Sequence, residues 1–195
     1  MLDTYGRKYV SPLIGMWVNL FDRMGWSPTQ VTILAFVVGV ASMVAYYFGA
    51  LVLAVCLLWL SGLLDAVDGG LARKNNQTSK WGTLLDITFD RLVEIGMLII
   101  IATMHPYATY SILFVLGSII FSMTVFLTVG ALSTNDGKKS FRYQAGLAER
   151  TEGFLLITVM MIFTTQIDTI GYLFTGLIVF TALQRLIEAK KVLDS

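Results

Sequence analysis

Four aspartates between residues 65 and 90 could together form a metal-binding site. Asp65 and Asp68 are three residues apart and Asp86 and Asp90 are four apart, so each pair shares one face of a helix. Two such helices packed side by side would bring the four carboxylates to one place. An ionised aspartate inside a membrane helix costs about 2.5–3.5 kcal/mol on insertion scales. Divalent cations such as Mg²⁺ offset this cost, because hard cations take carboxylate oxygens as ligands.

The rest of the chain is too apolar for a soluble domain. Its 195 residues are 56% hydrophobic and 14% charged, and the mean hydropathy is +0.73. Soluble domains carry about 25% charged residues. We therefore expect an all-α integral membrane protein that forms a single domain over residues 1–195. The one cysteine, Cys56, excludes a disulfide framework and a thiolate metal site within the chain.

Seven helices are expected to position these aspartates. Residues 3–24 place apolar side chains at helical spacing among charged ones, which predicts an amphipathic helix lying at the membrane surface. A bundle of six apolar segments follows over residues 31–189, and most of them reach the roughly 20 residues that cross a bilayer. The expected spans are residues 31–48, 51–72, 82–104, 108–132, 150–166 and 170–189.

The basic residues predict the orientation of this bundle. All of them fall on one side of the six-span arrangement except Arg91, which lies within the third span. Cytoplasmic loops carry the excess of lysine and arginine in membrane proteins. We therefore expect both termini, the polar loops 73–81 and 133–149, and the aspartate cluster on the cytoplasmic side. The loop 133–149 is either a lid that orders on substrate or a solvated connector.

The spacing of the central stretch is D-x2-D-G-x2-A-R-x8-G-x3-D-x3-D. It closely resembles the signature of the CDP-alcohol phosphotransferase family, integral membrane enzymes of phospholipid synthesis. An amphipathic N-terminal helix followed by six spans is also the plan of that family, and the resemblance implies a homodimer. The eight matching positions are Asp65, Asp68, Gly69, Ala72, Arg73, Gly82, Asp86 and Asp90.

The resemblance implies a role for each aspartate. Asp65, Asp68 and Asp86 would be metal ligands, and Asp90 would complete the site and act as the general base. The metal would be Mg²⁺ or Mn²⁺, with two ions bound, which neutralise the diphosphate charge. The implied reaction transfers a phosphatidyl group from CDP-diacylglycerol, or a related CDP-alcohol, to a small hydroxyl acceptor and releases CMP.

The glycines and the arginine of the signature fit a phosphate-binding role. By resemblance, Gly69 and Arg73 contact the diphosphate, and the planar donor fork of arginine matches phosphate oxygens. Glycine at 69 and 70 removes side chains where the diphosphate would approach the helix. Gly82 is a further candidate for CDP-lipid binding and is also expected to allow close helix contact.

The stretch SPTQVT at 27–32 resembles the Pro-Asn-x-x-Thr segment with which the family helps to bind the nucleotide, although threonine replaces the asparagine. Thr29 and Thr32 are therefore candidate nucleotide contacts. A helix start with Pro28 in its first turn, capped by Ser27 or Thr29, explains the same residues equally well.

Family members that use phosphorylated acceptors carry basic residues at the start of span five and near the end of span six. Gly153 and the segment TVGALS at 128–133 stand where phosphoinositol-type relatives carry further basic residues. The pattern therefore favours glycerol 3-phosphate as acceptor, with inositol phosphate and serine left open. Charges that only set topology explain the basic positions as well. The candidate acceptor-binding residues are Arg150, Arg185, Lys138 and Lys139.

Two other functions remain as alternatives. The aspartates could form a structural polar cluster paired with Arg73 and Arg91, or bind the cargo of an ion or metabolite transporter. Carriers place charged residues near the middle of the membrane, reachable from both sides. Here the aspartates gather at one end of their spans. No nucleic acid partner is expected.

Overall fold

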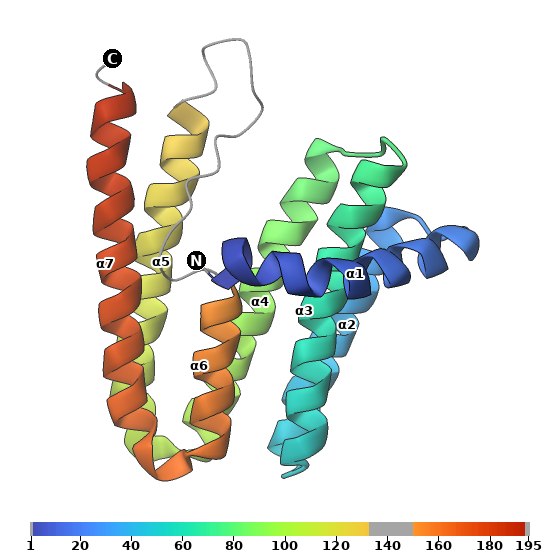
Figure 1. Cartoon of the computed structure of the whole chain (residues 1–195). Helices are drawn as coiled ribbons and strands as arrows, with labels where there is room; N and C mark the ends of the chain where they lie inside the picture. The colour runs from blue at the N-terminus through green and yellow to red at the C-terminus, as the bar shows by residue number, and fades with distance from the viewer. Residues whose placement is uncertain (1, 133–149, 194–195) are drawn as a thin grey trace. The chain divides into compact units, whose positions relative to one another are not determined.

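The computed structural model describes residues 2–132 and 150–193, with side chains described for residues 11–132 and 151–190. All regular elements in these ranges are helices (Figure 1). They are α1 (Leu2–Arg23), α2 (Pro28–Tyr47), α3 (Leu51–Lys74), α4 (Lys80–Met104), the 3-10 helix η1 (Pro106–Ala108), α5 (Thr109–Leu132), α6 (Arg150–Ile162), the 3-10 helix η3 (Thr164–Gln166) and α7 (Ile167–Leu193).

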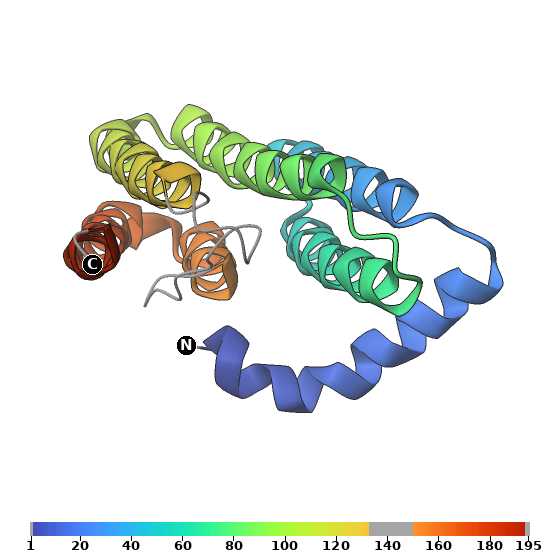
Figure 2. The ribbon, with the colours of Figure 1, turned by 90° about the horizontal axis from the view of Figure 1, so that it is seen from above.

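The described helices divide into two compact units. The first covers Thr4–Met104 and contains α1 from Thr4 onward together with α2 to α4, and the second contains α5 to α7, from His105 onward. In the first unit α2 packs against both α3 and α4 (Figure 2). In the second unit α7 packs against α5 and α6. The four aspartates of the signature all lie in the first unit.

Four stretches are long and apolar enough to cross a membrane: Pro28–Tyr47, Leu51–Lys74, Pro106–Leu132 and Thr164–Lys190. They correspond to the first, second, fourth and sixth expected spans, so the all-α membrane class is confirmed. The third and fifth expected spans, α4 and α6, are not among these four stretches. Helix α4 has 25 residues but carries charged residues of the signature, and helix α6 has only 13 residues. The expected end of the fifth span at residue 166 was wrong. Thr164 and Thr165 belong to a 3-10 turn, because threonine is a weak helix former.

Local sequence explains where the helices of the first unit begin and end. Ser27 caps α2, and a capping box with Gln30 satisfies two backbone N–H groups. Gly25, Gly49 and Asn76 adopt positive φ just beyond α1, α2 and α3. At each of these ends a residue donates to a carbonyl five positions earlier, the signature of the Schellman motif. Asn76 therefore fixes the end of α3 directly after the signature arginine.

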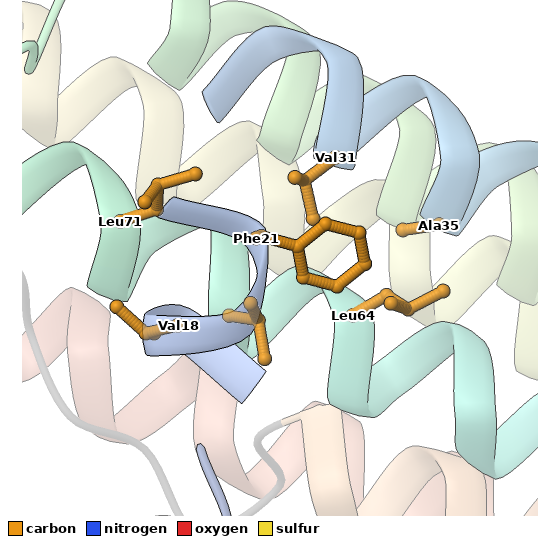
Figure 3. Packing of buried hydrophobic residues seen from close by; sticks show 7 residues of the cluster. Val18, Phe21, Val31, Ala35, Leu64 and Leu71 are labelled. Atoms are coloured by element: carbon orange, nitrogen blue, oxygen red, sulfur yellow. The ribbon is translucent and has the colours of Figure 1, made fainter. Parts of the chain in front are cut away.

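A hydrophobic cluster attaches α1 to the two helices that follow it. Helix α1 runs across α3 rather than alongside it (Figure 1). Phe21 of α1 points between α2 and α3 in the close view of Figure 3, and its ring meets that of Trp26 at 5.3 Å. The buried members of this cluster are Val18, Phe21, Val31, Ala35, Leu64, Val67 and Leu71.

Gly39 sets the separation of α2 and α4. A Cβ atom at this position would lie 2.5 Å from Cγ2 of Val93, and a short β-branched side chain cannot move away easily. We expect Gly39→Ala to lower the free energy of unfolding by about 1–3 kcal/mol, as overpacked cores do. Thermal unfolding of the purified protein measures this effect.

The chain offers a matched control for this prediction. A Cβ atom at Gly117 of α5 would meet no atom of the described residues within 4 Å, so Gly117→Ala should be neutral or slightly stabilising. Adding Val93→Ala to Gly39→Ala should recover part of the loss. Equal melting temperatures for the two glycine variants would contradict this account of α2 and α4.

Candidate metal and nucleotide site

Three carboxylates converge between α3 and α4. Ligand oxygens of Asp65, Asp68 and Asp86 all lie within 4.8 Å of one another. Asp68 is buried, with 4% of its surface exposed, and Asp65 and Asp86 are half-buried. The structure thus brings together three of the four aspartates that the spacing selected. We call this group the carboxylate trio.

The carboxylate trio fits a divalent cation. Within the described part of the chain, Oδ2 of Asp68 is buried and accepts no hydrogen bond. A buried oxygen without a partner is costly, and three close carboxylates also repel one another. A hard cation relieves both costs, because Mg²⁺ and Mn²⁺ prefer oxygen ligands. The donor set and the unsatisfied oxygen therefore suit a metal centre.

Helix geometry and capping place the trio. Asp65 and Asp68 share a face of α3, whereas Asp86 lies in the second turn of α4. The hydroxyl of Ser79 accepts a hydrogen bond from the N–H of Gly82 at 3.0 Å, which starts α4. Among the described residues, a Cβ atom at Gly82 would meet only Ser79 Oγ, at 3.2 Å. The expected close helix contact at Gly82 was therefore wrong, because this glycine lies in the first turn beside its own cap.

Asp90 lies one turn beyond Asp86 on α4, outside the carboxylate trio. It is half-buried and close enough to Asp86 and Asp68 to interact with them electrostatically. The next turn holds Glu94, a buried carboxylate that forms an ion pair with Arg91. Sequence reasoning missed this pair, although its i, i+3 spacing is a recognised signal. The same face of α4 thus presents three acidic residues in succession.

Arg73 lies over the first glycine of the signature. Its Nη1 atom is 3.3 Å from the position of a Cβ on Gly69, one turn earlier on α3. Arg73 is exposed and also interacts electrostatically with Asp68. Gly70 was expected to leave space for the diphosphate, but a Cβ atom there would lie 2.8 Å from Val18 of α1. Gly70 thus serves helix packing, and Gly69 is the glycine beside the arginine.

The two threonines of α2 differ in their surroundings. Thr32 is buried, its hydroxyl lies 3.0 Å from the carbonyl oxygen of Pro28, and the hydroxyl is also within hydrogen-bonding reach of Asp68. Thr29 is half-buried in the first turn of α2. Capping by Ser27 is confirmed, so the helix-start interpretation holds. It does not conflict with a nucleotide role for Thr32, which lies beside the trio.

The candidate acceptor residues belong to the second half of the chain. Lys138 and Lys139, and the expected lid at 133–149, lie outside the described residues, as does the side chain of Arg150. Arg185 is buried on α7. Its Nη1 donates to Ser122 Oγ of α5 at 3.4 Å, and its guanidinium lies 5.3 Å from the ring centre of Phe126. Arg185 is thus held by α5 within its own unit.

Comparison with known proteins identifies the family. The family model for CDP-alcohol phosphatidyltransferase matches residues 26–187. The chain belongs to this family, and the resemblance carried by the eight signature positions is confirmed. It is therefore an enzyme of phospholipid synthesis that transfers substituted phosphate groups.

Relatives match the chain over nearly its whole length. It is 32% identical over 202 residues to an archaetidylinositol phosphate synthase from Pyrococcus horikoshii, covering 100% of this chain and 99% of the relative. It is 30% identical over 195 residues to the inner membrane protein YnjF of Escherichia coli, covering 95% and 93%. These matches agree with an integral membrane protein.

A solved structure shares the fold. The chain superposes on the phosphatidylinositol phosphate synthase of Mycobacterium tuberculosis, crystallised with CDP-DAG bound, with a TM-score of 0.71. The two sequences are 24% identical, and the match covers 92% of this chain and 94% of the other. The same enzyme in complex with manganese and citrate matches with a TM-score of 0.70, covering 90% and 88%.

Proposed function

We propose that this enzyme transfers a lipid phosphate group from a CDP-linked diacyl lipid to inositol phosphate and releases CMP, with a divalent metal ion as cofactor. The observation that carries the proposal is the carboxylate trio with the unsatisfied buried oxygen of Asp68. The position of Arg73 over Gly69, at the edge of this trio, supports binding of the diphosphate there.

The relatives favour inositol phosphate over the glycerol 3-phosphate that the sequence pattern suggested. The Pyrococcus horikoshii relative is an archaetidylinositol phosphate synthase and matches end to end. A relative from Streptomyces avermitilis, 32% identical over 95 residues, is a phosphatidylinositol phosphate synthase, although the match covers only 48% of this chain and 39% of that one. The lack of basic residues at Gly153 and in 128–133 was a weaker indication, because other cations can bind the same phosphate.

The proposed chemistry assigns a task to each group. A metal ion held by Asp65, Asp68 and Asp86 supplies positive charge that stabilises the transferring phosphate. Asp90 takes the proton from the acceptor hydroxyl, whose oxygen then bonds to the phosphorus next to the lipid. The bond from that phosphorus to the CMP oxygen breaks. Arg73 holds diphosphate oxygens through its donor fork, and the absence of a side chain at Gly69 gives the diphosphate access to the helix.

Further parts of the proposal concern the second unit and the membrane. Arg150 and Arg185, with Lys138 or Lys139, would bind the phosphate of the acceptor. Helices α4 and α6 would complete six spans in one domain, with α1 at the membrane surface, both termini and the trio cytoplasmic, and two chains forming a homodimer. A cysteine introduced at Gln77 should react with an impermeant reagent only from the cytoplasmic side. Reaction from the outside alone would reverse this topology.

An acceptor panel tests the proposed function directly. The purified chain would receive CDP-diacylglycerol, Mn²⁺ or Mg²⁺, and one of inositol phosphate, inositol, glycerol 3-phosphate or serine. A phosphate bound by arginine contributes about 1.5–3 kcal/mol, so CMP release should be roughly ten- to a hundredfold faster with inositol phosphate than with inositol. Release without any metal ion would contradict the metal requirement.

The other results of this panel are equally informative. Faster release with glycerol 3-phosphate than with inositol phosphate would overturn the proposed acceptor and restore the one that the sequence pattern suggested. CDP-lipid binding without turnover would mean that the acceptor was missing from the panel. Folded protein that neither binds CDP-lipid nor releases CMP would refute the proposed reaction.

A further inference from the structure

The last two turns of α3 present two neighbouring faces with different partners. Each face has a glycine and, four residues later, a cation, which lie one above the other on a helix. Gly69 and Arg73 form the face beside the carboxylate trio. Gly70 and Lys74 form the face that meets α1, where Val18 occupies the space above Gly70. One glycine and one cation of α3 thus face the carboxylate trio, and the other glycine and cation face α1.

A polar network closes the second face against α1. Lys74 Nζ lies 2.8 Å from Oδ2 of Asp22 and donates to Oδ1 of Asn19 at 2.7 Å. Asn75 Nδ2 donates to the other oxygen of Asp22 at 2.9 Å. We call these four residues the α1 latch. The hydrogen bond from Lys74 lowers the pKa of Asp22, so this carboxylate stays ionised at neutral pH.

The α1 latch acts on the turn that carries the phosphate-binding arginine. Lys74 and Asn75 directly follow Arg73 and are the last helical residue and the C-cap of α3. Helix ends fray unless side chains or tertiary contacts hold them. Buried Val18 and Phe21 pack α1 against α2 and α3, and this packing holds the neighbouring Asp22 in place. An isolated exposed ion pair contributes little, but here one carboxylate binds two consecutive residues.

We propose that Asp22 is a positioning residue for diphosphate binding: it holds Lys74 and Asn75 on α1 and thereby keeps Arg73 turned toward the site. Because consecutive helical side chains point about 100° apart, holding Lys74 against α1 fixes the direction of Arg73. Without Asp22, the last turn of α3 loosens and Lys74 competes with Arg73 for anionic groups. The inference rests on the proposed function for the phosphate role of Arg73.

Asp22→Asn in the full-length protein, reconstituted in lipid, tests this role. The KM for CDP-lipid should rise about three- to fivefold, the size expected for a surface ion pair, while kcat changes by less than about twofold. Asp168→Asn in the second unit makes the same change of charge and serves as the matched control. The charge-swapped pair Asp22→Lys with Lys74→Asp should restore KM, because the amides of Asn19 and Asn75 can turn to suit either polarity.

Amide hydrogen exchange provides a readout that does not depend on activity. The N–H groups of Asn75 and Gln77 donate to Leu71 and Ala72 at the end of α3. They should exchange about three- to fivefold faster in Asp22→Asn than in wild type, and at the wild-type rate in the charge-swapped protein. The Asp168→Asn control should show no change at these amides.

The possible outcomes separate this inference from the proposed function. If wild-type protein releases no CMP, the proposed function fails, but the exchange difference still tests the α1 latch. If the wild type is active and Asp22→Asn matches Asp168→Asn in both KM and exchange, the positioning role is refuted. A charge-swapped protein as impaired as Asp22→Asn would likewise overturn the ion-pair basis of the inference.

Discussion

Replacing Asp68 with asparagine should abolish both Mn²⁺ binding and CMP release. Asp68 is the most buried member of the carboxylate trio, and its Oδ2 accepts no hydrogen bond from the described residues. An amide at this position removes one negative charge and turns one ligand oxygen into a donor nitrogen. Loss of metal stabilisation worth several kcal/mol should slow CMP release by about 10³-fold or more. Calorimetric titration with Mn²⁺ and a CMP-release assay measure the two effects.

Asp168→Asn is again the matched control, because it removes a carboxylate that belongs to the other unit. It should retain Mn²⁺ binding and CMP release at the level of the wild type. Asp86→Asn should behave like Asp68→Asn, since both residues belong to the same trio. Wild-type Mn²⁺ affinity in either trio variant would show that the metal binds elsewhere.

Asp90→Asn should separate catalysis from metal binding. Asp90 lies outside the trio, one turn farther along α4, so Mn²⁺ affinity should change by only a few-fold. Its proposed task is to take the proton of the acceptor hydroxyl, and loss of a general base lowers kcat by about 10²–10⁴-fold. Binding of CDP-lipid should persist. The measurements are the same Mn²⁺ titration and the kcat for CMP release.

Two results would change the assignment of Asp90. If Mn²⁺ binding falls as far as it does in Asp68→Asn, Asp90 is also a ligand and completes the centre, as the family resemblance implied. If kcat stays within about twofold of the wild type, Asp90 is not the general base, since that role contributes far more. Glu94 is then the next carboxylate on the same face of α4.

The sequence by itself predicted the family, the all-α class and the three aspartates that converge between α3 and α4. Apolar segments bounded by glycine, proline and charge predicted the ends of α3 to within a few residues, at Leu51 and Lys74. The spacing of Asp65 and Asp68 placed both on one face, because helical periodicity is local and is fixed by backbone geometry. The eight signature positions were sufficient to indicate the family, and the family model confirms it.

Only the tertiary structure decided which neighbours surround residues that look alike in the sequence. Gly69 and Gly70 are adjacent and chemically identical, yet one lies beside Arg73 and the other beneath Val18 of α1. The structure also brought Asp65, Asp68 and Asp86 within 4.8 Å of one another and joined Asp22 to Lys74, more than fifty residues away. Spacing along one helix says which residues share a face, but not which neighbour covers that face. The packing of α1 across α3 decides that, through long-range burial that no local pattern encodes.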